Sequence, residues 1–80
     1  MVDKYIPFTE EIRGIYGLKN VVMEYNERYD SIILHFTTKQ YKRIDNEKSA
    51  TWKHFCELLE KYDYRAEFTG VYCIEVYEEE

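Results

Sequence analysis

The stretch Ser31-Ile-Ile-Leu-His-Phe-Thr-Thr38 decides the fold of this 80-residue chain. Within it, Ile32, Leu34 and Phe36 alternate with residues that face the other way. A period of two is typical of a β-strand with one buried face, because successive side chains point to opposite sides of a sheet. The stretch therefore predicts a half-buried strand, and with it a sheet whose two faces differ.

Two further strands are predicted beside this one. Leu18–Tyr25 places Val21, Met23 and Tyr25 on one face, and the mostly polar residues 26–30 supply the loop of a hairpin. Gln40–Ile44 follows a turn at residues 37–39 and is expected to be a short third strand. Residues 18–44 are thus predicted to form a three-stranded meander.

An amphipathic helix is predicted over residues 47–62, with Asp45 or Asn46 as its N-cap. Its apolar side chains recur at helical spacing and form a single stripe, which needs an apolar surface to pack against. The members of the stripe are Trp52, Phe55, Cys56, Leu59 and Tyr62. The helix is therefore expected to lie across one face of the sheet.

A second hairpin is predicted over residues 64–77. Tyr64–Phe68 and Val71–Tyr77 both alternate, and Thr69 and Gly70 between them are suited to a tight turn. The hairpin adds two strands after the long helix.

The first 17 residues are expected to form an extended lead-in followed by a short helix. Thr9 is a suitable N-cap, and Glu10 and Glu11 suit the positive end of the helix dipole. Gly14 or Gly17 is expected to end the helix in the left-handed conformation.

These elements predict one α+β domain over residues 1–80. Its small antiparallel sheet has about five strands with one long helix packed on one face, in the order (short α)-β-β-β-α-β-β.

Parity along the strands sorts the side chains onto two faces. The helix-facing set is Met23, Tyr25, Ile32, Leu34, Phe36, Tyr64, Phe68, Tyr72, Ile74 and Val76. The opposite set is Val22, Glu24, Ile33, His35, Arg65, Glu67, Val71, Cys73, Glu75 and Tyr77.

The second face is not cleanly polar, and two interpretations of its apolar members remain open. Either the N-terminal segment covers them, or they form a contact surface for a partner or for a second copy of the chain, because exposed apolar patches on small proteins mark contacts. The covering residues would be Ile6, Phe8, Ile12 and Ile15.

The charges are distributed unevenly along the chain. The net charge is −5, and residues 62–80 carry six acidic residues against Arg65 alone, so the whole excess lies in this segment. An acidic surface repels nucleic acid and attracts basic proteins. We therefore expect a protein partner with a basic groove, although Glu78–Glu80 could also be no more than a solvated terminus. The expected partner-binding residues are Asp63, Glu67, Glu75, Tyr77 and Glu78.

A basic stretch supports an alternative in which the chain binds nucleic acid. Residues 39–43 interleave an aromatic side chain with cations, which is the minimum for base stacking combined with phosphate contact. The residues of this alternative site are Lys39, Tyr41, Lys42, Arg43, Lys48 and Lys53.

The residues that commonly carry catalysis are sparse. Cys56 and Cys73 fit no zinc-binding pattern, and two free thiols suit a reducing compartment. His54 points away from Cys56 on the helix, and parity places His35 on the face opposite Cys56, so no cysteine is expected to have a histidine base. We expect no metal, no cofactor and no enzymatic activity.

In size, acidity and codon usage the chain resembles the small acidic single-domain proteins, anti-CRISPR proteins among them, with which phages inhibit host enzymes. The resemblance covers no motif. It implies that the chain blocks a nucleic-acid-binding groove in a host enzyme. An antitoxin or immunity protein would bind by the same electrostatic attraction, but to a different target.

No apolar run approaches the ~20 residues that span a bilayer, and no leader opens the chain, so a soluble cytoplasmic protein is expected, in the host cytoplasm if phage-encoded.

Overall fold

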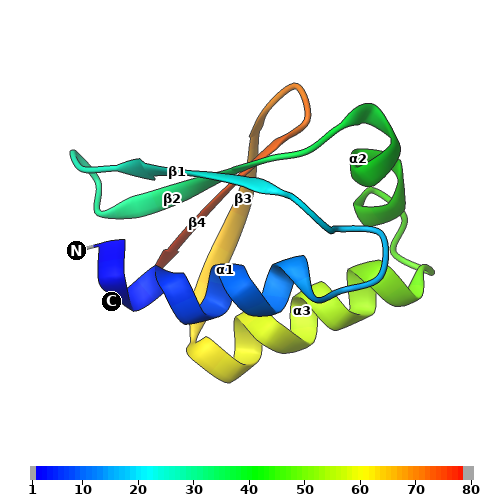
Figure 1. Cartoon of the computed structure of the whole chain (residues 1–80), viewed down its shortest axis with the longest axis horizontal. Helices are drawn as coiled ribbons and strands as arrows, with labels where there is room; N and C mark the ends of the chain where they lie inside the picture. The colour runs from blue at the N-terminus through cyan, green and yellow to red at the C-terminus, as the bar shows by residue number, and fades with distance from the viewer. Residues whose placement is uncertain (1, 79–80) are drawn as a thin grey trace.

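The computed structural model describes residues 2–78 and shows an α+β fold. A four-stranded antiparallel sheet, in the order β1-β2-β4-β3, is covered on one face by helices (Figure 1). The elements are η1 (Val2–Tyr5), α1 (Ile6–Arg13), β1 (Val22–Asn26), β2 (Ser31–His35), α2 (Thr38–Ile44), α3 (Ala50–Tyr62), β3 (Tyr64–Gly70) and β4 (Cys73–Glu78). None of these helices is long and apolar enough to cross a membrane.

Both predicted hairpins are present, and β4 pairs with β2 to join them into one sheet. Leu34 lies opposite Met23 of β1 and Ile74 of β4, so the alternating stretch runs through the centre of the sheet. The β3–β4 turn differs from its predicted position: β3 continues through Gly70, and the turn is at Val71 and Tyr72. Tyr72 takes the left-handed conformation there, with φ of 62°.

The predicted third strand at residues 40–44 is wrong, because this segment is helix α2. The Thr37 hydroxyl accepts a hydrogen bond from the Gln40 backbone N–H at 3.1 Å, and the Thr37 N–H donates to Gln40 Oε1 at 2.9 Å. This reciprocal capping box satisfies two backbone N–H groups that a helix start otherwise leaves unpaired. The sheet therefore has four strands rather than about five, and the helical layer contains α1 and α2 besides the long helix α3.

Helix α3 starts three residues later than predicted. Ser49, not Asp45 or Asn46, is its N-cap and accepts a hydrogen bond from the Trp52 N–H at 3.0 Å. Asp45 instead ends α2. Of the predicted stripe, Phe55 is fully buried and the other members are half-buried, whereas Leu58, which the stripe omitted, is buried.

The expected N-terminal extended lead-in is also wrong, because the chain is helical from Val2 to Arg13. Thr9 lies inside α1, where its hydroxyl donates to the Tyr5 carbonyl oxygen at 2.9 Å, and Gly17 is left-handed after the helix. Tyr5, Phe8 and Ile12 have no exposed surface and follow helical spacing. This segment packs in the helical layer, so it does not cover the opposite face of the sheet.

The core lies between the helices and one face of the sheet, as parity predicts. Phe8 of α1 contacts the rings of Phe55, Tyr62 and Tyr64, with centroid distances of 6.4, 5.6 and 5.2 Å. Six of the predicted helix-facing strand residues are buried: Ile32, Leu34, Phe36, Tyr64, Ile74 and Val76. Met23 and Tyr25 are half-buried, and Phe68 and Tyr72, at the turn end of the second hairpin, are exposed.

The replacement Phe55→Ala is expected to lower the free energy of unfolding by about 3–5 kcal/mol, because it removes buried surface and leaves a cavity. Total stabilities are about 5–15 kcal/mol, so this loss will be visible in urea unfolding followed by circular dichroism. The exposed Glu57 on the same helix supplies a control, and Glu57→Ala should stay within about 0.5 kcal/mol of the parent. If the two variants unfold at the same urea concentration, the packing of α3 described above is incorrect.

Candidate functional site

The sheet face turned away from the helices, called here the outer face, is open. β1 contributes Val22 and Glu24, and β2 contributes Ile33 and His35; β4 and β3 contribute Cys73, Glu75, Tyr77, Arg65 and Glu67, all placed by the strand register. Val22 is 59% exposed. Between residues 2 and 78, the helices all pack into the core on the other face, so the outer face is available to a partner.

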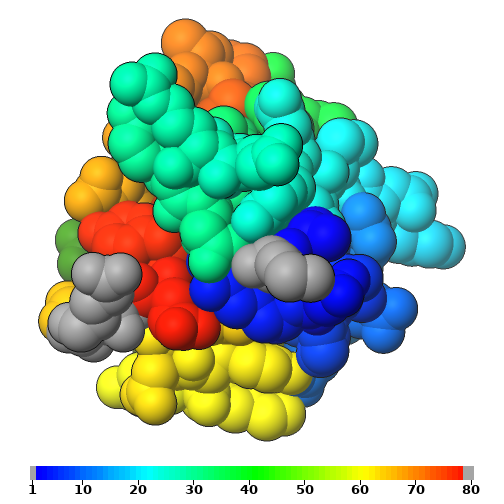
Figure 2. Space-filling view, turned by 90° about the vertical axis from the view of Figure 1, so that its left-hand side faces the viewer, coloured from blue at the N-terminus to red at the C-terminus, as the bar shows by residue number. Residues whose placement is uncertain are grey.

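One feature of this region, called here the acidic hollow, is an open hollow of about 550 Å³. Figure 2 shows the end of the molecule at which the β1–β2 turn, the end of β4 and the N-terminal residues meet. Four carboxylates and one ammonium group line the hollow, so its charge is strongly negative. The lining consists of Lys4, Tyr29, Asp30, Ser31, Glu67, Glu75, Tyr77 and Glu78. Four of the five predicted partner-binding residues are therefore brought together here.

Two of these carboxylates are held in place by hydroxyl groups. Glu67 of β3 lies directly opposite Glu75 of β4, an arrangement of like charges that destabilises a sheet. Ser31 donates a hydrogen bond to Glu75 Oε2 at 2.6 Å, and Tyr77 donates to Glu67 Oε1 at 2.9 Å. The bond to Glu67 raises the pKa of Tyr77 above its usual value. Both carboxylates are thus oriented at the surface by hydroxyl donors.

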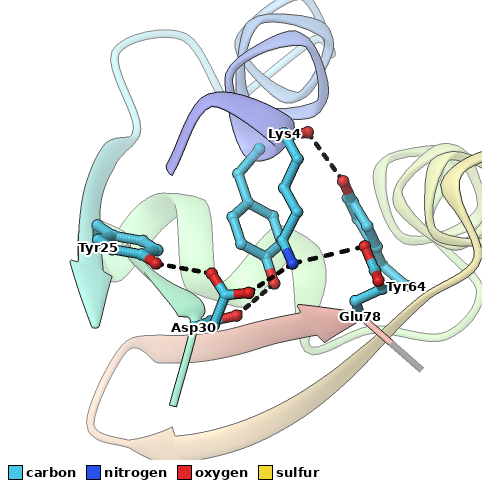
Figure 3. Close-up of polar contacts among 6 residues, drawn as sticks. Lys4, Tyr25, Asp30, Tyr64 and Glu78 are labelled. Carbon is cyan, nitrogen blue, oxygen red and sulfur yellow. Dashed lines mark hydrogen bonds and ion pairs between the residues drawn. The ribbon is translucent and has the colours of Figure 1, made fainter. Parts of the chain in front are cut away.

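A polar network closes the N-terminal side of the hollow (Figure 3). Lys4 Nζ lies 2.6 Å from Asp30 Oδ2 and 3.5 Å from Glu78 Oε2, and Tyr25 donates to Asp30 Oδ1 at 2.6 Å. The Lys4 carbonyl oxygen accepts a hydrogen bond from Tyr64 at 2.8 Å. The bond from Lys4 holds the pKa of Asp30 well below its usual value, and the bond to Asp30 raises the pKa of Tyr25 to about 12. The network ties the N-terminal segment to the β1–β2 turn and to β4.

Asp63, the fifth predicted residue, is not part of the acidic hollow. It ends α3 in the left-handed conformation, with φ of 57°, and lines a separate hollow beside Cys56 and Leu59. The sequence segment 62–80 is acidic as a whole, but the fold places its members on different surfaces. Glu79 and Glu80 lie outside the described residues.

The basic stretch of the alternative site lies on and around α2, at the far end of the long axis from the chain termini (Figure 1). Tyr41 is half-buried, with its ring 5.8 Å from Phe68 and 5.3 Å from Tyr72, and Arg43 lies over the Tyr16 ring at 5.2 Å. Neither side chain is presented as the predicted stacking platform. The exposed cations of the set are Lys39, Lys42, Lys48 and Lys53.

A cysteine–histidine pair on the outer face is missed by the sequence analysis. His35 Nδ1 lies 3.3 Å from Cys73 Sγ, and His35 Nε2 lies 2.9 Å from Glu24 Oε1. The structure therefore places a histidine beside Cys73, which the sequence did not predict. Parity already places all three residues on one face; the missing information is that β4 pairs with β2, which sets Cys73 opposite His35.

The described residues offer no ready-made metal site: within residues 2–78, no group of three or more His, Cys, Asp or Glu side chains is placed to hold a metal ion. Comparisons with protein-family models, curated proteins and solved structures give no match. The function is therefore inferred from the geometry and charge of the site itself.

The replacement Asp30→Asn is expected to lower the melting temperature at neutral pH, because it removes the charge that Lys4 and Tyr25 stabilise. A carboxyl whose pKa is lowered by folding stabilises the folded state above its unfolded pKa, and this contribution disappears as the pH falls toward the folded value. The difference in melting temperature should therefore narrow below about pH 4. Thermal unfolding of the parent and of Asp30→Asn at a series of pH values measures this difference in melting temperature.

Asp45→Asn is the matched control, because it removes one exposed negative charge outside the network. A difference between Asp30→Asn and the parent that stays constant from about pH 7 to pH 2 would contradict a stabilising role for the Asp30 charge.

Proposed function

We propose that the chain is a non-catalytic protein-binding module whose outer face, centred on the acidic hollow, docks on a basic surface of a partner. The observation that carries the proposal is the opposed pair Glu67 and Glu75, fixed beside Tyr77 on a sheet face that the helices leave open. Complementary charge speeds association and selects the partner.

Tyr77 is the proposed anchor of the contact. Tyrosine presents a large apolar area with a polar tip and loses little rotational freedom on binding. Here the side chain is half-buried and its hydroxyl is held by Glu67 at 2.9 Å, so part of that freedom is already lost. Ile33 and the exposed Val22 on the same face supply further apolar area.

The partner's chemistry follows from the sign of the charge. A surface that offers four carboxylates against one ammonium group repels nucleic acid and complements a groove that binds phosphates. The proposed mechanism is therefore occlusion of the nucleic-acid-binding groove of a host enzyme, as in the phage-encoded inhibitors that the chain resembles, acting in the host cytoplasm. An antitoxin or immunity protein would use the same surface on another target.

The double charge reversal Glu67→Lys with Glu75→Lys tests the proposal. Immobilised parent protein captures partners from host extract, and each captured protein is then purified and its binding kinetics are measured. The on-rate for the double variant should fall by about tenfold or more at low salt, and the difference should shrink at high salt as the charges are screened. Duplex DNA or RNA should compete with the parent for the same partner.

The matched control is Glu57→Lys with Glu60→Lys, which makes the same charge change on the exposed surface of α3. Circular dichroism checks that both double variants fold. If the outer-face variant folds and binds at the parent rate, the acidic hollow is not the docking surface. If the parent itself binds labelled nucleic acid, with an affinity that falls steeply with salt, the lysines around α2 become the better site. If the parent self-associates and the outer-face variant does not, the outer face binds a second copy of the chain instead of a different protein.

A further inference from the structure

Three side chains form a line across the outer face, one from each of three adjacent strands. Cys73 of β4 lies opposite His35 of β2, and Glu24 of β1 lies on the far side of the ring. The distances are 3.3 Å from Cys73 Sγ to His35 Nδ1 and 2.9 Å from His35 Nε2 to Glu24 Oε1. The His35 side chain is 41% exposed, so reagents in solution can reach the site.

The contact with Glu24 selects the histidine form that can take a proton from the thiol. A carboxylate only accepts hydrogen bonds, so Nε2 carries a proton that it donates to Glu24. In neutral imidazole this leaves Nδ1 as the acceptor that faces Cys73 Sγ. The Val71 carbonyl oxygen, 3.4 Å from the sulfur, is the alternative acceptor for the single thiol proton. Only transfer to the ring gives the nucleophilic thiolate.

We propose that Cys73 is a site of thiol–disulfide exchange with small neutral or positively charged disulfides, with His35 as its base and Glu24 as a positioning residue. The Cys73 thiolate attacks one sulfur of the disulfide, a new sulfur–sulfur bond forms to Cys73, and the other half leaves as a thiolate. The proton from Cys73 passes to His35 and then to the leaving thiolate. The disulfide is the oxidant, so the exchange is balanced without a further co-reactant.

Disulfide exchange is the chemistry that this open surface suits. The attacking and leaving groups are both sulfur anions, so exchange needs only an accessible thiolate and a direct approach to the disulfide. Acyl transfer also needs donors placed around a developing oxyanion, usually in a site that excludes water. A nucleophile and base on an exposed sheet face meet the requirements of disulfide exchange. They do not supply the oxyanion donors and the exclusion of water that acyl transfer needs.

The charge of the outer face determines which disulfides react. Glu24 of β1, Glu67 of β3 and Glu75 of β4 lie on the same face as the sulfur, where Arg65 of β3 is the one cationic side chain among the described strand residues, so the face is negative on balance. Anionic disulfides are repelled by these carboxylates, and cationic ones are concentrated near them. The proposal does not depend on the docking of a protein partner.

Cys56 provides an internal control. It lies on α3 in the opposite layer, where burial, and to a smaller extent Glu60, raises the pKa of its thiol. No histidine is among the groups that shift the pKa of Cys56. The parity argument likewise predicts that Cys73 reacts faster than Cys56.

The test uses the full chain with cystamine as the dicationic probe and 3,3′-dithiodipropionate as the dianionic one. Mass spectrometry of quenched samples gives the rate of mixed-disulfide formation at each cysteine. Cys73 in the Cys56→Ser chain should react faster than Cys56 in the Cys73→Ser chain, and the preference for cystamine should be larger at Cys73. His35→Gln should slow Cys73 at neutral pH by about tenfold or more, since a positioned base is removed.

The pH profile separates a base from a residue that only shapes the surface. In the parent, the rate at Cys73 should rise at a lower pH than in a chain that lacks the His35 ring, because the ring takes the thiol proton. In His35→Gln the rate should increase only in alkaline solution, and Glu24→Gln should give an intermediate profile. A His35→Gln chain that folds and reacts at the parent rate at every pH would overturn the proposal, as would equal rates at Cys73 and Cys56. Equal preference for the two probes at both cysteines would overturn the charge selectivity.

Discussion

The width of the sheet's buried face is the constraint on which the rest of the structure depends. Neighbouring strands lie about 4.8 Å apart, so four strands present an apolar face wider than the about 10 Å of one helix. Helix α3 covers part of it, and η1 with α1 covers a further part through Tyr5, Phe8 and Ile12. The N-terminal segment is therefore needed in the helical layer, and the outer face stays open.

The open face explains why opposed carboxylates are tolerated on it. Glu67 and Glu75 sit across from each other where water screens them, and Tyr77 and Ser31 donate hydrogen bonds that orient them. The same pair on the inner face would lie in the core and would not be tolerated. A sheet that accepts this local repulsion keeps a concentrated negative charge at its surface, which is the property that a docking surface for a basic groove requires.

The parity of the strands was predictable from the sequence, whereas the pairing of the two hairpins was not. Alternation around Leu34 assigns side chains to the inner and outer faces of the sheet even when the order of the strands is unknown. The contact between Cys73 and His35 needs the order β1-β2-β4-β3, which nothing local in the chain encodes. Helix α2 was predictable in principle, because Thr37 and Gln40 have capping-box spacing. The separation of Asp63 from the acidic hollow follows from its left-handed position at the end of α3, which its charge does not reveal.

One electrostatic field connects the two proposals for the outer face. The acidic hollow lies at the end of the long axis opposite α2, the helix around which the exposed Lys39, Lys42 and Lys48 lie (Figure 1). In the proposed function, a basic partner would be drawn toward the acidic hollow as it approaches. In the proposed exchange, the carboxylates on the face that carries Cys73 would likewise repel anionic thiol reagents. Salt weakens both effects together because both arise from exposed charges. A mixed disulfide at Cys73 would place its added group on the docking face itself, so the charge of that group would add to or subtract from the field that guides the partner.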